Sequence, residues 1–141
     1  MNGEEEFPSL VKLTIRRCPK LKSMPEIQSL QHLELQNWLI IIPEDLHELS
    51  SLECLEISEC PNLVALPEAQ LSNLSKLRSL YILSCQKLSF LPESLKYVTS
   101  LQTLEIHNCP DLKALLGWID NLSFLQSLVI SECHGIKPLS R

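Results

Sequence analysis

The stretch Leu52–Pro67, LECLEISECPNLVALP, contains the pattern that decides the fold. Its apolar residues take fixed places in the phrase L-x-x-L-x-I-x-x-C-P-x-L-x-x-L-P. Leu55 and Ile57 are two residues apart with a polar residue between them, which is the periodicity of a β-strand with one buried face. We expect the strand to end at the following Cys60-Pro61 pair, because proline fixes the backbone and has no N–H to donate to a sheet.

Copies of this phrase follow one another along the chain. The first leucine of each copy is Leu10, Leu30, Leu52, Leu77, Leu101 or Leu125, so successive copies begin 20, 22, 25, 24 and 24 residues apart. A short strand of this kind cannot bury its apolar face alone, but stacked copies bury a continuous column of leucine and isoleucine. We therefore predict an α/β leucine-rich-repeat solenoid, a horseshoe of about six repeats with a parallel β-sheet on its concave face.

The predicted domain organisation is an N-terminal segment at 1–9 followed by one leucine-rich-repeat domain at 10–141. Short helical or 3-10 turns are expected on the convex face, where a second proline is followed by glutamate. Proline favours the first turn of a helix because its φ angle is already fixed near the helical value. Glutamate is favourable there because its negative charge interacts with the positive end of the helix dipole. These pairs are Pro25-Glu26, Pro43-Glu44, Pro67-Glu68 and Pro92-Glu93. The fifth copy has Leu116-Gly117 instead, so its convex turn is expected to differ.

Five of the six cysteines share one repeat position, three residues after the strand isoleucine. They are Cys18, Cys60, Cys85, Cys109 and Cys133, and the second copy has Trp38 there. We expect a buried ladder of reduced thiols, since cysteine behaves as a small hydrophobe in a core. No C-x-x-C or closely spaced histidine pair is present, so we predict neither a metal site nor a cofactor.

Composition narrows the classes of partner. The 141-residue chain has 12 basic and 17 acidic residues and a net charge of -5, which argues against nucleic acid and against an anionic membrane surface. The longest apolar run, Leu39–Ile42, is far too short to span a bilayer. The first six residues include three glutamates and no basic residue, where a signal peptide would be basic and then apolar, so a cytoplasmic location is expected.

The polar positions of the predicted strands define the candidate site, a concave face for binding another protein. Its predicted residues are Lys12, Arg16, His32, Glu34, Glu56, Tyr81, Leu83, Glu105 and His107. This face is basic at the first strand and acidic at the next two, and Tyr81 and Leu83 then interrupt the charge. An exposed aromatic residue beside charges favours contact with a basic element of a partner. The alternative is that these charges only keep the sheet in solution.

Catalysis has one weak candidate. His32 and Cys54 occupy the same row of neighbouring strands, about 5 Å apart, and such a pair can act as base and nucleophile. An open sheet offers no pocket, no third orienting group and no preorganised oxyanion donors. We therefore expect that the protein is not an enzyme.

Phrases such as LECLEISECPNLVALPE and LQTLEIHNCPDLKAL resemble the C-terminal repeats of plant intracellular nucleotide-binding leucine-rich-repeat immune receptors, throughout residues 7–141. The resemblance implies a ligand-sensing or autoregulatory role in disease resistance. It also implies a protein partner: an effector, a guarded host protein or other domains of the same receptor. The G-x-x-x-x-G-K-[ST] loop of the receptors' nucleotide-binding domain is absent from this sequence. A stand-alone repeat adaptor or inhibitor that binds a protein outside immunity is the alternative.

Solenoid ends need polar caps, and neither end of this sequence contains an obvious one. Self-association through the terminal repeats is therefore a further expectation, which size-exclusion chromatography with light scattering can test.

Overall fold

The computed structural model describes residues 7–18, 20–24, 26–37, 42, 44–66, 71–113 and 122–136. Strands and 3-10 helices make up its regular structure. They are β1 (Lys12–Arg16), β2 (His32–Gln36), η1 (Glu44–Glu48), β3 (Cys54–Ser58), η2 (Leu71–Asn73), β4 (Ser79–Leu83), η3 (Glu93–Tyr97), β5 (Thr103–His107) and β6 (Ser127–Ser131). Within these residues there is no helix with the length and apolar character that a membrane crossing requires.

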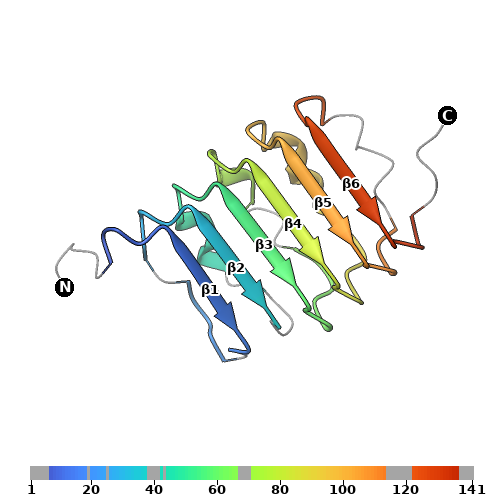
Figure 1. Ribbon diagram of the computed structural model, residues 1–141, viewed down its shortest axis with the longest axis horizontal. Coiled ribbons are helices and arrows are strands. Elements are labelled where there is room, and N and C mark those ends of the chain that lie inside the picture. The colour runs from blue at the N-terminus through green and yellow to red at the C-terminus, as the bar shows by residue number, and fades with distance from the viewer. Residues whose placement is uncertain are drawn as a thin grey trace.

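All six strands form one parallel sheet in chain order, β1-β2-β3-β4-β5-β6 (Figure 1). The register places equivalent repeat positions side by side, so that Leu33 pairs with Leu55 and Leu55 pairs with Leu80. Each turn of the chain therefore adds one rung to the same column. This arrangement confirms the predicted fold class, a leucine-rich-repeat solenoid.

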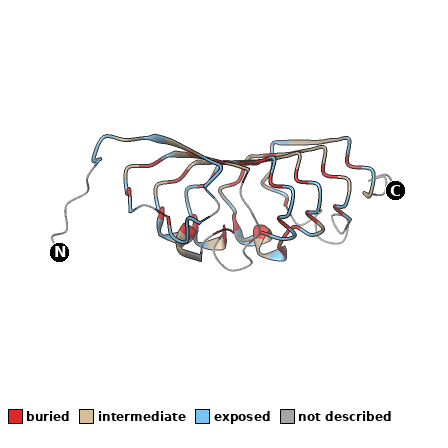
Figure 2. Ribbon diagram, turned by 90° about the horizontal axis from the view of Figure 1, so that it is seen from below, coloured by how far each residue is buried: buried red, intermediate tan, exposed pale blue. Residues whose placement is uncertain are grey.

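The side opposite the sheet is formed by the 3-10 helices and by irregular segments (Figure 2). η1 begins at Glu44, and η3 begins at Glu93, directly after Pro92, as the Pro-Glu pairs predict. The first repeat differs from this prediction, because Glu26 leads into a turn and not into a helix. Its copy is the shortest, 20 residues from Leu10 to Leu30, which leaves less chain for the convex side. The pair Pro67-Glu68 and the residues Leu116-Gly117 lie outside the described residues.

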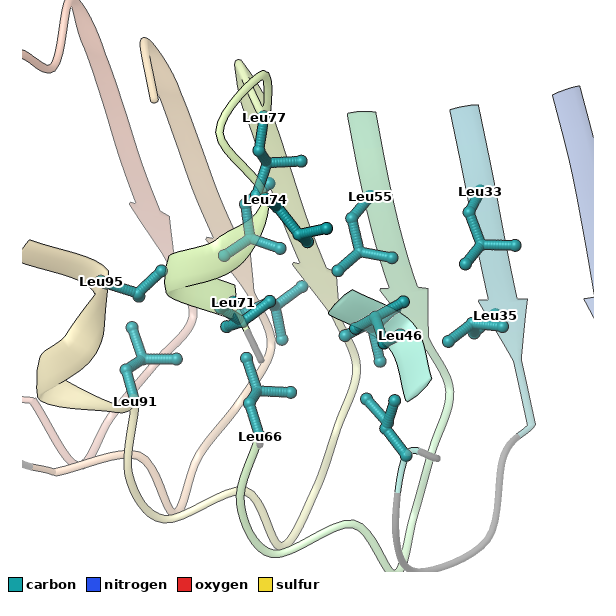
Figure 3. Packing of buried hydrophobic residues seen from close by; sticks show 14 of the residues in the cluster. Leu33, Leu35, Leu46, Leu55, Leu66, Leu71, Leu74, Leu77, Leu91 and Leu95 are labelled. Atoms are coloured by element: carbon teal, nitrogen blue, oxygen red, sulfur yellow. The ribbon is translucent and has the colours of Figure 1, made fainter. Parts of the chain in front are cut away.

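The core is a continuous column of aliphatic side chains between the sheet and the helices (Figure 3). Leu55, Leu80 and Leu104 on the strands are 0% exposed, as are Leu71 and Leu95 on the helices. Full burial of one such side chain contributes about 1.5–3 kcal/mol relative to leaving it in water. Because the aliphatic column supports every central strand from behind, the opposite face of the sheet is held rigidly.

The residue directly after each strand has a positive φ, between 54° and 57°, and none of these residues is glycine. They are Arg17, Asn37, Glu59, Ser84, Asn108 and Glu132. The left-handed conformation turns the chain toward the core. After β1 to β5 the amide of this residue donates to a carbonyl of the next repeat, as from Glu59 to the Leu83 carbonyl at 2.8 Å. The six-fold repetition makes this conformation part of the fold and not a local irregularity.

The cysteine ladder is present from the third repeat onward. Cys60, Cys85 and Cys109 are 0% exposed and Cys133 is 8% exposed. Each thiol donates to the carbonyl two residues earlier, as from Cys60 Sγ to the Ser58 oxygen at 3.4 Å. The prediction was wrong for Cys18, which is exposed. It belongs to the first rung, and the equivalent position of the next repeat is Trp38, which lies outside the described residues.

Candidate functional site

The concave face consists of three rows of strand residues on the face of the sheet that does not bear the leucine core. In Figure 2 this is the face of the sheet away from the 3-10 helices. The middle row is Thr14, Glu34, Glu56, Tyr81, Glu105 and Val129. The outer rows are Lys12, His32, Cys54, Ser79, Thr103 and Ser127 on one side, and Arg16, Gln36, Ser58, Leu83, His107 and Ser131 on the other. The register thus brings all nine sequence-predicted site residues onto one surface.

Exposure on this face differs between its end and its centre. Lys12 and Arg16 on β1 are exposed, whereas the other seven predicted residues are half-buried. Ser58 in an outer row is only 7% exposed, because its short side chain lies between Gln36 and Leu83. Longer side chains therefore form the accessible part of the surface.

Glu34 is the most connected side chain of the face. Its Oε1 accepts a hydrogen bond from the Thr14 hydroxyl at 3.2 Å. Its Oε2 lies 3.5 Å from Lys12 Nζ and 3.3 Å from His32 Nε2. The basic end at β1 and the acidic centre are therefore in direct contact.

Glu56 is the direct neighbour of Glu34 in the middle row. Burial first, and then the charge of Glu34, raise the pKa of the Glu56 carboxyl above its ordinary value, while His32 and Lys12 act in the opposite direction. Within the described part of the chain, no hydrogen bond or ion pair fixes the Glu56 carboxylate. Like charges side by side in a sheet are unfavourable, so this pair is suited to a positively charged ligand.

His32 Nε2 also lies 3.7 Å from the Cys54 sulfur, as the shared row predicts. Burial raises the pKa of the Cys54 thiol to about 11, and the nearby carboxylates of Glu56 and Glu34 add to the effect. A nucleophilic cysteine needs the opposite environment, one that lowers its pKa and favours the thiolate. The Cys54 and His32 pair therefore lacks the electrostatics of a catalytic dyad.

Tyr81 and Leu83 on β4 form the apolar break of the face. Tyr81 lies between Glu56 and Glu105 in the middle row, and Leu83 lies between Ser58 and His107. On the next strand, His107 Nε2 and Glu105 Oε1 are 3.1 Å apart. The aromatic ring is thus flanked by carboxylates on both sides.

One grouping on this face was missed by the sequence reasoning. His32, Glu34 and Glu56 each place one potential metal-ligand atom within 4.8 Å of the others. A search for short spacings such as C-x-x-C could not find it, because Glu56 is on a different repeat from His32 and Glu34. The signal was the shared register, which the repeat pattern predicts.

A six-stranded parallel sheet with 3-10 turns opposite, built from this repeat, defines a leucine-rich-repeat solenoid. The solved structure of the leucine-rich-repeat domain of the type III effector XopL is similar to it, with a TM-score of 0.76 and 28% sequence identity. The similarity covers 94% of this chain and 49% of that chain, so the protein spans about half the length of that structure. Neither a protein-family model nor a curated protein matches the sequence.

Proposed function

We propose that the protein is a protein-binding scaffold and that its concave face, from β2 to β5, contacts a basic element of a protein partner. One observation carries this proposal: Glu34, Glu56, Tyr81 and Glu105 are consecutive members of a single row that faces solvent. Acidic side chains supply attraction for a basic segment, and the tyrosine supplies contact area at little cost in conformational entropy.

The rigidity of the surface supports the same proposal. Each strand from β2 to β5 is fixed by its neighbours and by fully buried leucines behind it, such as Leu55 and Leu80. A surface that is already ordered loses little conformational freedom on binding, so more of the contact energy appears as affinity. The similarity to a solved leucine-rich-repeat domain also favours a scaffold over an enzyme.

We further propose that this chain is the repeat region of a plant intracellular immune receptor, where it senses a ligand or restrains the receptor. The support is the resemblance of phrases such as LECLEISECPNLVALPE to the repeats of that class. A stand-alone adaptor or inhibitor outside immunity has the same fold and would use the same face. The messenger RNA distinguishes the two, because a nucleotide-binding domain encoded upstream on the same transcript is expected only for the receptor.

The binding proposal is tested with two matched double charge reversals. Glu34→Lys/Glu56→Lys changes the concave face, and Glu48→Lys/Glu93→Lys changes two exposed residues of η1 and η3 on the convex side. Partners are first captured with the wild-type chain and then measured one by one by isothermal titration calorimetry. We expect the concave reversal to weaken binding by at least about tenfold and the convex reversal to leave it unchanged. Affinity that survives both the concave reversal and Tyr81→Ala would contradict the proposal.

A further inference from the structure

We propose that His32, Glu34 and Glu56 form a binding site for one divalent transition-metal ion, such as Zn²⁺, on the concave face across β2 and β3. One ligand atom from each residue already lies within 4.8 Å of the other two. The site requires no partner protein, so it can be tested independently of the proposed function.

The donor distances fit a metal of this class. Zinc bound by nitrogen and oxygen at about 2.0–2.2 Å in a tetrahedron has ligand atoms about 3.3–3.6 Å from one another. His32 Nε2 and Glu34 Oε2 are 3.3 Å apart. The Glu56 oxygen lies within 4.8 Å of both atoms. No hydrogen bond within the described residues restrains the Glu56 carboxylate, so its side chain is free to rotate toward a bound ion.

The backbone brings the three donor side chains together. Glu34 and Glu56 are register partners on adjacent parallel strands, and His32 is two residues before Glu34 on the same side of the sheet. The Thr14 hydroxyl donates to the other oxygen of Glu34 and so orients that carboxylate, as hydrogen bonds around metal ligands commonly do. Three protein donors on a tetrahedral ion leave one coordination position for water.

The chemistry of the donors selects the metal. Two carboxylates supply negative charge, and the imidazole nitrogen favours zinc and its neighbours over magnesium or calcium, which prefer oxygen alone. Lys12 competes for the site, because its Nζ lies 3.5 Å from the same Glu34 oxygen that the metal would use. The Lys12 side chain is 57% exposed, so a bound cation can displace it into water.

The protein contains its own control pair. His107 and Glu105 on β5 have the same two-residue spacing, with Nε2 and Oε1 3.1 Å apart. The neighbours of Glu105 in its row are Tyr81 and Val129, which offer no carboxylate. A single histidine and glutamate pair without a second carboxylate should bind metal far more weakly.

The test titrates the whole chain with Zn²⁺ alone by calorimetry, and with Co²⁺ followed by its visible absorption. We expect one ion per chain. His32→Ala and Glu56→Gln should each weaken binding by more than about tenfold, since even changes outside the ligand set cost that much at many sites. His107→Ala should leave the affinity unchanged. Lys12→Met, which removes the competing charge and keeps the aliphatic stem, should strengthen it.

Three results would overturn the site. These are no saturable binding, binding that survives His32→Ala, or binding that is lost in Cys54→Ser but kept in Glu56→Gln. The last result would assign the ion to the sulfur and the imidazole, which are 3.7 Å apart, and not to the two carboxylates. Circular dichroism of each variant verifies the fold, and the gain expected for Lys12→Met cannot arise from misfolding.

Discussion

At the scale of single residues, the environment of Cys54 determines its chemistry. A cysteine next to a histidine suggests a nucleophile, but Glu34 and Glu56 lie close to both residues. Their negative charge adds to the effect of burial in raising the pKa of the Cys54 thiol to about 11. The same carboxylates that favour a cation therefore oppose a thiolate.

This environment predicts slow alkylation of Cys54. In a Cys18→Ser variant, Cys54 is the one half-buried thiol, because the other four are buried. A pKa raised from 9.0 to about 11 leaves about 100-fold less thiolate below pH 9 than in an ordinary thiol. We expect iodoacetamide to react correspondingly slowly at pH 8, with a rate that keeps rising from pH 9 to 11 while that of N-acetylcysteine levels off. Glu56→Gln should speed the reaction, and a rate at pH 8 equal to the reference thiol would contradict the prediction.

At the scale of elements, the left-handed residue after each strand is a recurring point of backbone strain. This conformation costs about 1–2 kcal/mol for most residues other than glycine, and among these asparagine is one of the residues that tolerate it best. Asn37 and Asn108 occupy the position in two repeats, while Glu59 and Ser84 occupy it in two others. The sequence therefore fits the backbone better in some repeats than in others.

We predict that Glu59→Asn stabilises the protein by about 0.5–1 kcal/mol, because it relieves part of the strain at φ 54°. Glu59 is exposed and its amide still donates to Leu83, so no packing is lost. The change Asn37→Ala, which removes a favourable asparagine from the same position of another repeat, should destabilise the protein by a similar amount. Urea unfolding measured by circular dichroism gives both values. Equal stability of all three proteins would show that the turn is not strained.

The elements also show how far the sequence could be interpreted. Strand positions, register and the members of the concave face follow from repeat periodicity, because stacking leaves one way to bury Leu55, Leu80 and their equivalents. The missed features depend on backbone angles or on neighbours: the positive φ of Glu59, the burial of Ser58 and the exposure of Cys18. Asparagine at 37 and 108 was the signal for the first of these. The metal-ligand grouping needed two repeats to be considered together.

At the scale of the whole molecule, the protein is a one-dimensional stack, and among the described elements the strands contact the strands of adjacent repeats. The burial of equivalent side chains therefore depends on the position of their repeat along the stack. Leu33, Leu55, Leu80 and Leu104 are 0% exposed, whereas Leu13 on β1 and Leu128 on β6 are only partly buried at the same repeat position. The same leucine position is therefore fully enclosed in the central strands and partly solvated in β1 and β6.

The stacked arrangement predicts that a leucine-to-alanine substitution at the same repeat position lowers stability by different amounts in different repeats. Leu80→Ala removes a side chain enclosed by β3 and β5, and should destabilise by about 2–5 kcal/mol. Leu13→Ala removes a partly solvated side chain on the end rung, and should cost about half as much or less. Hydrogen exchange should show which strands lose stability. Leu80→Ala should weaken the protection of backbone amides in β3, β4 and β5 together, and Leu13→Ala should weaken it in β1 and β2 alone. If Leu13→Ala also weakened protection of β5, the solenoid would unfold as one cooperative unit and not as coupled repeats, because a defect at one end would then propagate beyond its nearest neighbours.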